Sequence, residues 1–91
     1  MPSDRRERLL AAIKSRDVET TQRILEASAS YIARKYSGPI ADVGDLLPSL
    51  LLRASGITIV DADNLLWVME IIDVCGIYQA FNEAREAKHD G

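Results

Sequence analysis

The sequence predicts a single, all-helical domain. Its 91 residues leave room for one hydrophobic core. Apolar residues make up 47% of the chain and recur mainly at helical spacing. The one β-like run, residues 57–60, has no second run with which it could pair in a sheet. We therefore expect residues 1–91 to form one domain, with a core within about residues 4–88.

The first two predicted helices span about residues 3–15 and 17–35. The first has a narrow apolar stripe of Leu9, Leu10 and Ile13. The second has Asp17 as a suitable N-cap, and its Glu19 and Arg23 stand in the favourable i, i+4 order. The residues that share its inward side are Val18, Thr21, Ile24, Leu25, Ser28, Tyr31 and Ile32. This division into two faces is typical of an amphipathic helix at the surface of a core.

The middle of the chain is less regular. Residues 40–44 are too few for more than one helical turn, so we expect a short or irregular third element. A leucine-rich helix should begin at Asp45, with Pro48 in its first turn and Gly56 as its stop. Residues 57–60 should then form an extended connector whose apolar side chains close one end of the core.

The next predicted helix, from about Asp61 to Cys75, is apolar on two sides. One side carries Leu65, Val68, Met69 and Ile72, and the other carries Trp67, Ile71 and Val74. Such a helix is either central in a bundle or also faces a partner. Gly76 should end it. A last helix over about residues 77–88 should turn Ile77, Phe81 and Ala84 inward.

The charge of the chain is unevenly placed. The net charge is −3, which argues against general nucleic-acid binding. Residues 1–16 hold five basic and two acidic residues, a balance of +3, whereas residues 17–91 hold six basic and twelve acidic residues, a balance of −6. A basic first segment on an acidic body favours two copies meeting head to tail. The alternative interpretation is an ordinary solvated helix face.

The sequence offers no set of residues for catalysis or metal binding. Cys75 and His89 are too few ligands for zinc, and a histidine so near the end of the chain is a poor catalytic base. The run Asp61-Ala62-Asp63-Asn64 begins like a calcium loop, but Leu65 and Leu66 follow where a ligand and a glycine are required. We therefore expect no enzyme activity, no cofactor and no metal.

The sequence also predicts a cytoplasmic protein. The charged N-terminus lacks the apolar segment of a signal peptide, and the single cysteine, Cys75, suits a reducing compartment. The longest strongly apolar stretch, residues 65–75, is too short to cross a bilayer, so we expect no membrane insertion.

Two runs suggest a known family. The run Asp45-Leu46-Leu47-Pro48-Ser49-Leu50-Leu51-Leu52, followed by Asp63-Asn64-Leu65-Leu66, looks most like the fourth and fifth helices of the death effector domain. From about Leu9 to Ala87, the order of segments resembles the death-fold superfamily to which that domain belongs. The resemblance implies a death-fold-like, six-helix antiparallel bundle. It also implies a homotypic or heterotypic adaptor in apoptosis and other cell-death, inflammatory or defence signalling.

The sequence departs from that family at one motif. Death effector domains usually carry an Arg-x-Asp-Leu motif entering the last helix, paired with an acidic residue early in the second. The corresponding window here reads Val74-Cys75-Gly76-Ile77. An acidic residue stands in the second helix, at Glu19 or Asp17, but the charge triad cannot form. The resemblance is therefore to the pattern of segments and not to this motif.

These observations favour a protein-binding function. The predicted partner is a like helical domain or a second copy of the chain. The predicted interaction residues are Arg5, Arg6 and Arg8 on one face, Glu19, Arg23 and Glu26 on another, and Trp67. Tryptophan and arginine are over-represented in binding hot spots, although Trp67 has core packing as its alternative. A second hypothesis is an obligate symmetric homodimer that buries the side of Trp67, Ile71 and Val74.

Overall fold

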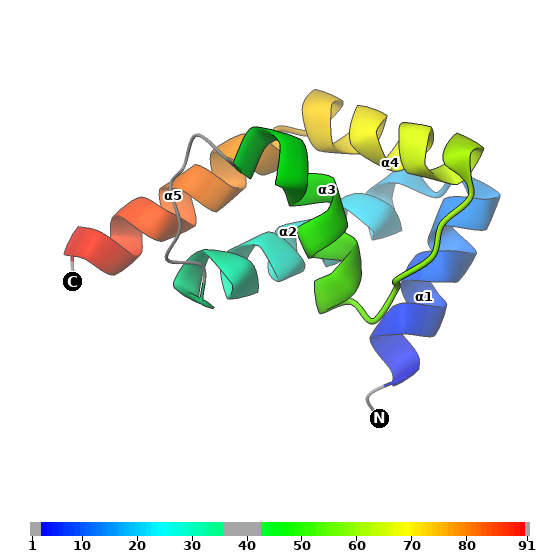
Figure 1. Cartoon of the computed structure of the whole chain (residues 1–91), viewed down its shortest axis with the longest axis horizontal. Coiled ribbons are helices and arrows are strands. Elements are labelled where there is room, and N and C mark those ends of the chain that lie inside the picture. Colours follow the sequence, from blue (N-terminus) through cyan, green and yellow to red (C-terminus); the bar gives the residue numbers. More distant parts are fainter. Residues whose placement is uncertain (1–2, 36–42, 91) are drawn as a thin grey trace.

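The computed structural model describes residues 3–35 and 43–90, and every regular element in this part of the chain is a helix (Figure 1). The elements are α1 (Ser3–Ser15), α2 (Val18–Lys35), α3 (Val43–Ala54), α4 (Ala62–Val74) and α5 (Ile77–Asp90). The all-helical prediction is confirmed for these residues, but they form five helices where six were expected. Of the predicted third element, residues 40–42 lie outside the described residues, and residues 43 and 44 belong to α3.

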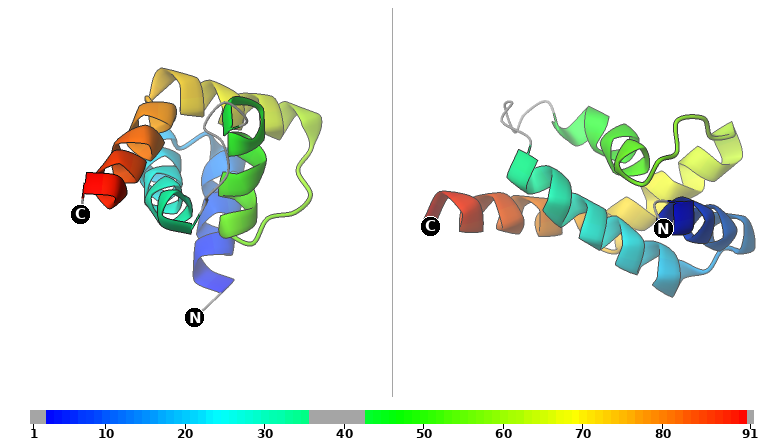
Figure 2. Two further views of the ribbon diagram at one scale, coloured as in Figure 1. Left: turned by 60° about the vertical axis from the view of Figure 1, so that its left-hand side comes forward. Right: turned by 90° about the horizontal axis from the view of Figure 1, so that it is seen from below.

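The antiparallel arrangement does not hold for the largest helix pair. α2 and α5 form the most extensive contact between helices, and they run in the same general direction (Figure 2). The reason lies at the junction of α4 and α5, where Gly76 has a φ of +68° and the helix axes bend by 59°. Because the chain bends there and does not reverse, α5 continues away from α1 beside α2.

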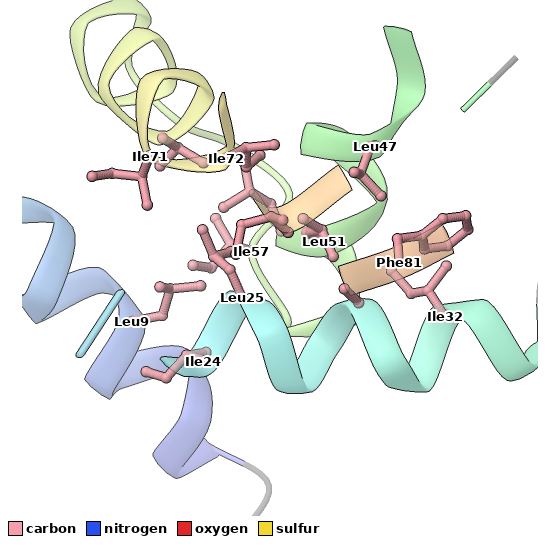
Figure 3. Close-up of a cluster of buried hydrophobic side chains, with 14 of the residues drawn as sticks. Leu9, Ile24, Leu25, Ile32, Leu47, Leu51, Ile57, Ile71, Ile72 and Phe81 are labelled. Carbon is pink, nitrogen blue, oxygen red and sulfur yellow. The ribbon is translucent and has the colours of Figure 1, made fainter. Parts of the chain in front are cut away.

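One core holds all five helices together (Figure 3). Each helix contributes at least one side chain that is completely buried; these include Leu9, Leu25, Leu51, Ile72 and Phe81. Burial of one such side chain stabilises a fold by roughly 1.5–3 kcal/mol. The inward residues predicted for α1, α2 and α5 are buried or partly buried, except that Val18 and Tyr31 are about half exposed.

α3 begins earlier than predicted, at Val43 and not after Asp45. Pro48 is therefore the sixth residue of the helix and lies outside its first turn. A proline at this position cannot donate a hydrogen bond to the carbonyl four residues earlier, so α3 lacks one bond of its ladder.

The end of α3 agrees with the prediction. Gly56 has a φ of +86°, and the Gly56 and Ile57 amides donate to the Arg53 and Leu52 carbonyls at 2.9 and 2.8 Å. This is the Schellman arrangement, for which glycine is favoured because L side chains rarely adopt positive φ. In the connector that follows, Ile57 is buried, whereas Ile59 is 87% exposed. Only part of the connector therefore closes the core.

The side of α4 that packs on the core combines residues from both of the apolar sides seen in the sequence. Its buried side chains are Val68 and Ile72 from one side and Ile71 from the other, while Met69, which was grouped with Val68 and Ile72, is 45% exposed. Positions 68, 71, 72 and 75 share one face at helical spacing. Ile71 therefore points into the core, and Met69 is displaced toward solvent.

Candidate interaction surfaces

The arginines predicted on α1 lie beside the end of α3. Arg5, Arg6 and Arg8 are all exposed, as expected for the polar side of an amphipathic helix. A Cβ atom placed on Gly56 would lie 3.5 Å from the Arg6 side-chain Cδ, in ordinary van der Waals contact. The apolar stem of Arg6 thus lies next to the Gly56 turn, which follows the end of α3.

Arg5 and Arg8 line a hollow of about 550 Å³, which we call the arginine hollow. Its full lining is Asp4, Arg5, Arg8, Arg53, Ala54, Ser55 and Gly56. Sequence reasoning missed Arg53, which stands in the last turn of α3. The lining carries three arginines and one aspartate, a balance of +2, and no described residue forms an ion pair with these arginines. The result is a concave, positively charged surface whose arginines have no ion-pair partner in the described part of the chain.

The residues predicted on α2 already pair with one another. Arg23 donates to Glu19 at 2.9 Å, and both side chains are well exposed. Glu26 accepts a hydrogen bond of 3.0 Å from the Gln22 amide. An exposed i, i+4 pair stabilises a helix by only about 0.3–0.5 kcal/mol. No described hydrogen bond or ion pair joins this group to the α1 arginines, so the structure does not combine them into one site.

Trp67 packs within the protomer, against the core and against Arg16. Its side chain is partly buried against the core. The guanidinium of Arg16 lies 5.1 Å from the centroid of its ring, within cation–π range. The same guanidinium donates to the Ile13 carbonyl and to Asn64 Oδ1, each at 3.0 Å. Trp67 is therefore engaged on the inside by the core and on one ring face by Arg16.

A second hollow, of about 500 Å³, lies on α4 and the start of α5, and we call it the α4 hollow. Its lining is Leu66, Met69, Glu70, Asp73 and Tyr78. Leu66 is 63% exposed, and Val74 beside the hollow is 79% exposed. α4 contains no basic residue, so the carboxylates of Glu70 and Asp73 give this apolar surface a negative charge. The i, i+3, i+4, i+7 spacing of these α4 residues could have shown this face in the sequence.

Among the described residues, Asp17 has a carboxyl pKa below its ordinary value. The Asp17 carboxylate accepts the Thr20 hydroxyl at 2.7 Å and the Thr20 amide at 3.2 Å, which confirms Asp17 as the N-cap of α2. These hydrogen bonds, with a smaller contribution from the charge of Arg23, lower the pKa of Asp17 below its ordinary value. The carboxylate is exposed, and it stabilises the N-terminal end of α2.

The described residues do not gather ligands for a metal. No group of three His, Cys, Asp or Glu side chains is suitably placed among them. Cys75 is a free, partly buried thiol, and the side chain of His89 lies outside the described residues. In the described part of the chain, no single helix is long and apolar enough to span a membrane. α4 with the first part of α5 meets those requirements only as a bent pair.

Comparison with known proteins gives no relative. No protein-family model, no curated protein and no solved structure matches this chain.

Proposed function

We propose that this protein is an interaction module that assembles with copies of itself or with like helical domains. The observation that carries this proposal is the presence of two concave surfaces of opposite charge on different helices. The arginine hollow is positive and the α4 hollow is negative and apolar. Charged groups that have no partner among the described residues are available for a partner protein, where complementary potentials give specificity and faster association.

The large exposed side chains of α4 support the same proposal. Leu66, Met69 and Val74 remain 63%, 45% and 79% exposed, whereas Val68, Ile71 and Ile72 of the same helix are buried. Exposed apolar side chains clustered on one helix mark contact surfaces more often than isolated ones do. A binding role therefore explains this face better than catalysis, for which the described residues offer no convergent set of polar groups.

The biological setting proposed is adaptor signalling in cell-death, inflammatory or defence responses, in the cytoplasm. This part of the proposal depends on the resemblance of the segment order to the death-fold superfamily. The all-helical architecture and the single core agree with the coarser expectation. The six-helix arrangement is not supported by the described residues, which form five helices.

The alternative, an obligate symmetric homodimer, is less favoured because most of the residues assigned to its interface pack within the protomer. Of the three residues assigned to it, Ile71 is buried in the protomer and Trp67 is held between the core and Arg16. Of the three, Val74 alone is well exposed, at 79%. One exposed valine is a small fraction of the ~800 Å² that each partner of a stable complex usually buries.

Sedimentation velocity at rising protein concentration and two salt concentrations tests the proposal. We expect species larger than a dimer to grow with concentration and to shrink at high salt, because salt screens exposed charges. A salt-insensitive dimer that stops growing would favour the alternative. A monomer at every concentration, together with no like domain retained in a pulldown, would exclude the interaction module.

A further inference from the structure

We propose that the arginine hollow of one copy docks on the α4 hollow of a second copy. This inference rests on the proposed function and specifies its two surfaces and its occupant. The surfaces share no residue, because one belongs to α1 and the end of α3 and the other to α4 and the start of α5. One protomer can therefore present both at the same time.

The charges of the two hollows match. The arginine hollow carries a balance of +2, and the α4 hollow, with Glu70 and Asp73 as its charged residues, carries a balance of −2. A symmetric contact of either hollow with its own copy would place like charges together, which is unfavourable. Charge complementarity therefore favours contact between unlike hollows of two copies.

The chemistry of the side chains also matches. A guanidinium presents a planar fork that pairs with a carboxylate through two parallel hydrogen bonds. Arginine stems pack along apolar surface while the charged head stays polar, and Leu66 and Met69 provide such surface between the carboxylates. Arg5 and Arg8, which are exposed and one turn apart on α1, are suited to reach Glu70 and Asp73 of the second copy.

The position of the hollows determines the kind of assembly. α4 runs along one side of the molecule, and the start of α1 and the end of α3 lie on the opposite side (Figures 1 and 2). A contact between different surfaces on opposite sides leaves one surface of each new copy free. Such heterologous contacts generate rings or open rows and do not stop at a dimer.

Two double variants test the pairing. Arg5→Glu with Arg8→Glu reverses the arginine hollow and leaves the α4 hollow intact. Leu66→Asp with Met69→Asp removes the apolar surface of the α4 hollow, adds like charge there and leaves the arginine hollow intact. All four side chains are exposed, so the fold should survive, and circular dichroism checks this. Lys14→Glu with Lys35→Glu makes the same change of charge as the first variant at exposed positions outside both hollows.

Each hollow variant alone should be monomeric, with an association constant reduced about 100-fold or more. The control variant should assemble like the natural chain. A mixture of the two hollow variants should form a 1:1 complex that does not grow, because only one intact hollow of each kind remains per pair. Sedimentation velocity and light scattering measure this.

The outcomes separate this inference from the proposed function. If the natural chain assembles and both hollow variants assemble equally well, the two hollows are not the contact, although the interaction module stands. If each variant is monomeric but the mixture gives no 1:1 complex, the pairing of unlike hollows is wrong. If the natural chain stays monomeric while it binds a different acidic protein through Arg5 and Arg8, a second copy is not the occupant.

Discussion

The guanidinium of Arg16 lies 5.1 Å from the centroid of the Trp67 ring and donates a hydrogen bond of 3.0 Å to Asn64. Arg16 follows the last residue of α1 and has a φ of +57°, in the left-handed region where glycine is usual. A non-glycine residue in this conformation costs about 1–2 kcal/mol. The contacts with α4 offset this cost and join the end of α1 to the start of α4.

Arg16→Ala should therefore lower the free energy of unfolding by about 1 kcal/mol, because it keeps the unfavourable backbone conformation and loses the contacts with α4. Arg16→Gly should leave the free energy of unfolding close to that of the natural chain. Glycine adopts the positive φ without strain, and this gain roughly offsets the lost contacts with α4. Urea unfolding followed by circular dichroism measures both. An Arg16→Ala variant as stable as the natural chain would show that the contacts contribute nothing.

Ile57 and Ile59 allow a matched comparison of burial. They are the same residue type in the same connector, but Ile57 is 3% exposed and Ile59 is 87% exposed. Ile57→Ala should destabilise the fold by about 2–5 kcal/mol through lost transfer energy and a cavity. Ile59→Ala should change the free energy of unfolding by less than about 0.5 kcal/mol. Equal effects in thermal or urea unfolding would contradict the described path of the connector.

Thr21 has a buried hydroxyl that no described residue satisfies. Thr21→Val should stabilise the fold by about 1 kcal/mol, because the desolvated hydroxyl is replaced by a methyl group of similar volume. Ser28 provides the control, since its buried hydroxyl is 3.1 Å from that of Ser55. Ser28→Ala should destabilise by about 1 kcal/mol by leaving Ser55 without its partner. If Thr21→Val destabilised by as much as Ser28→Ala, the Thr21 hydroxyl would have a hydrogen-bond partner after all.

Asp17 should make stability depend on pH at the acid end. Its folded pKa lies below the unfolded value of 3.8, because the hydroxyl and amide of Thr20 donate to the charged form. The stabilisation is therefore present above the unfolded pKa and is lost as the pH falls through the folded pKa. The melting temperature of the natural chain should exceed that of Asp17→Asn at pH 6, and the difference should shrink below pH ~4. A difference that stayed constant to pH 2 would show that the charge of Asp17 is not involved.

Local signals made much of the fold predictable. The cap at Asp17 and the stop at Gly56 depend on residues within a few positions along the chain, and both appear as expected. The side on which α4 packs was harder to predict. α4 carries apolar residues around most of its circumference, so sequence periodicity alone did not distinguish Met69 from Ile71.

The candidate surfaces required the tertiary structure. Arg53 joins Arg5 and Arg8 only because the end of α3 packs beside α1, and no short-range pattern contains that contact. Arg16 and Asn64, which are 48 positions apart in the sequence, show the same limitation. The sequence did show the uneven charge of the chain, with the acidic balance in residues 17–91 as a whole. It named Glu19, Arg23 and Glu26 as interaction residues and not Glu70 and Asp73, and Glu19 is already paired with Arg23.

The turn at Gly56 belongs both to the arginine hollow and to the entry of Ile57 into the core. A second copy bound in that hollow would stabilise the end of α3. The unfolded chain has no hollow and would not bind it. Folding and assembly are then linked by mass action. A higher protein concentration would therefore raise the melting temperature of each copy.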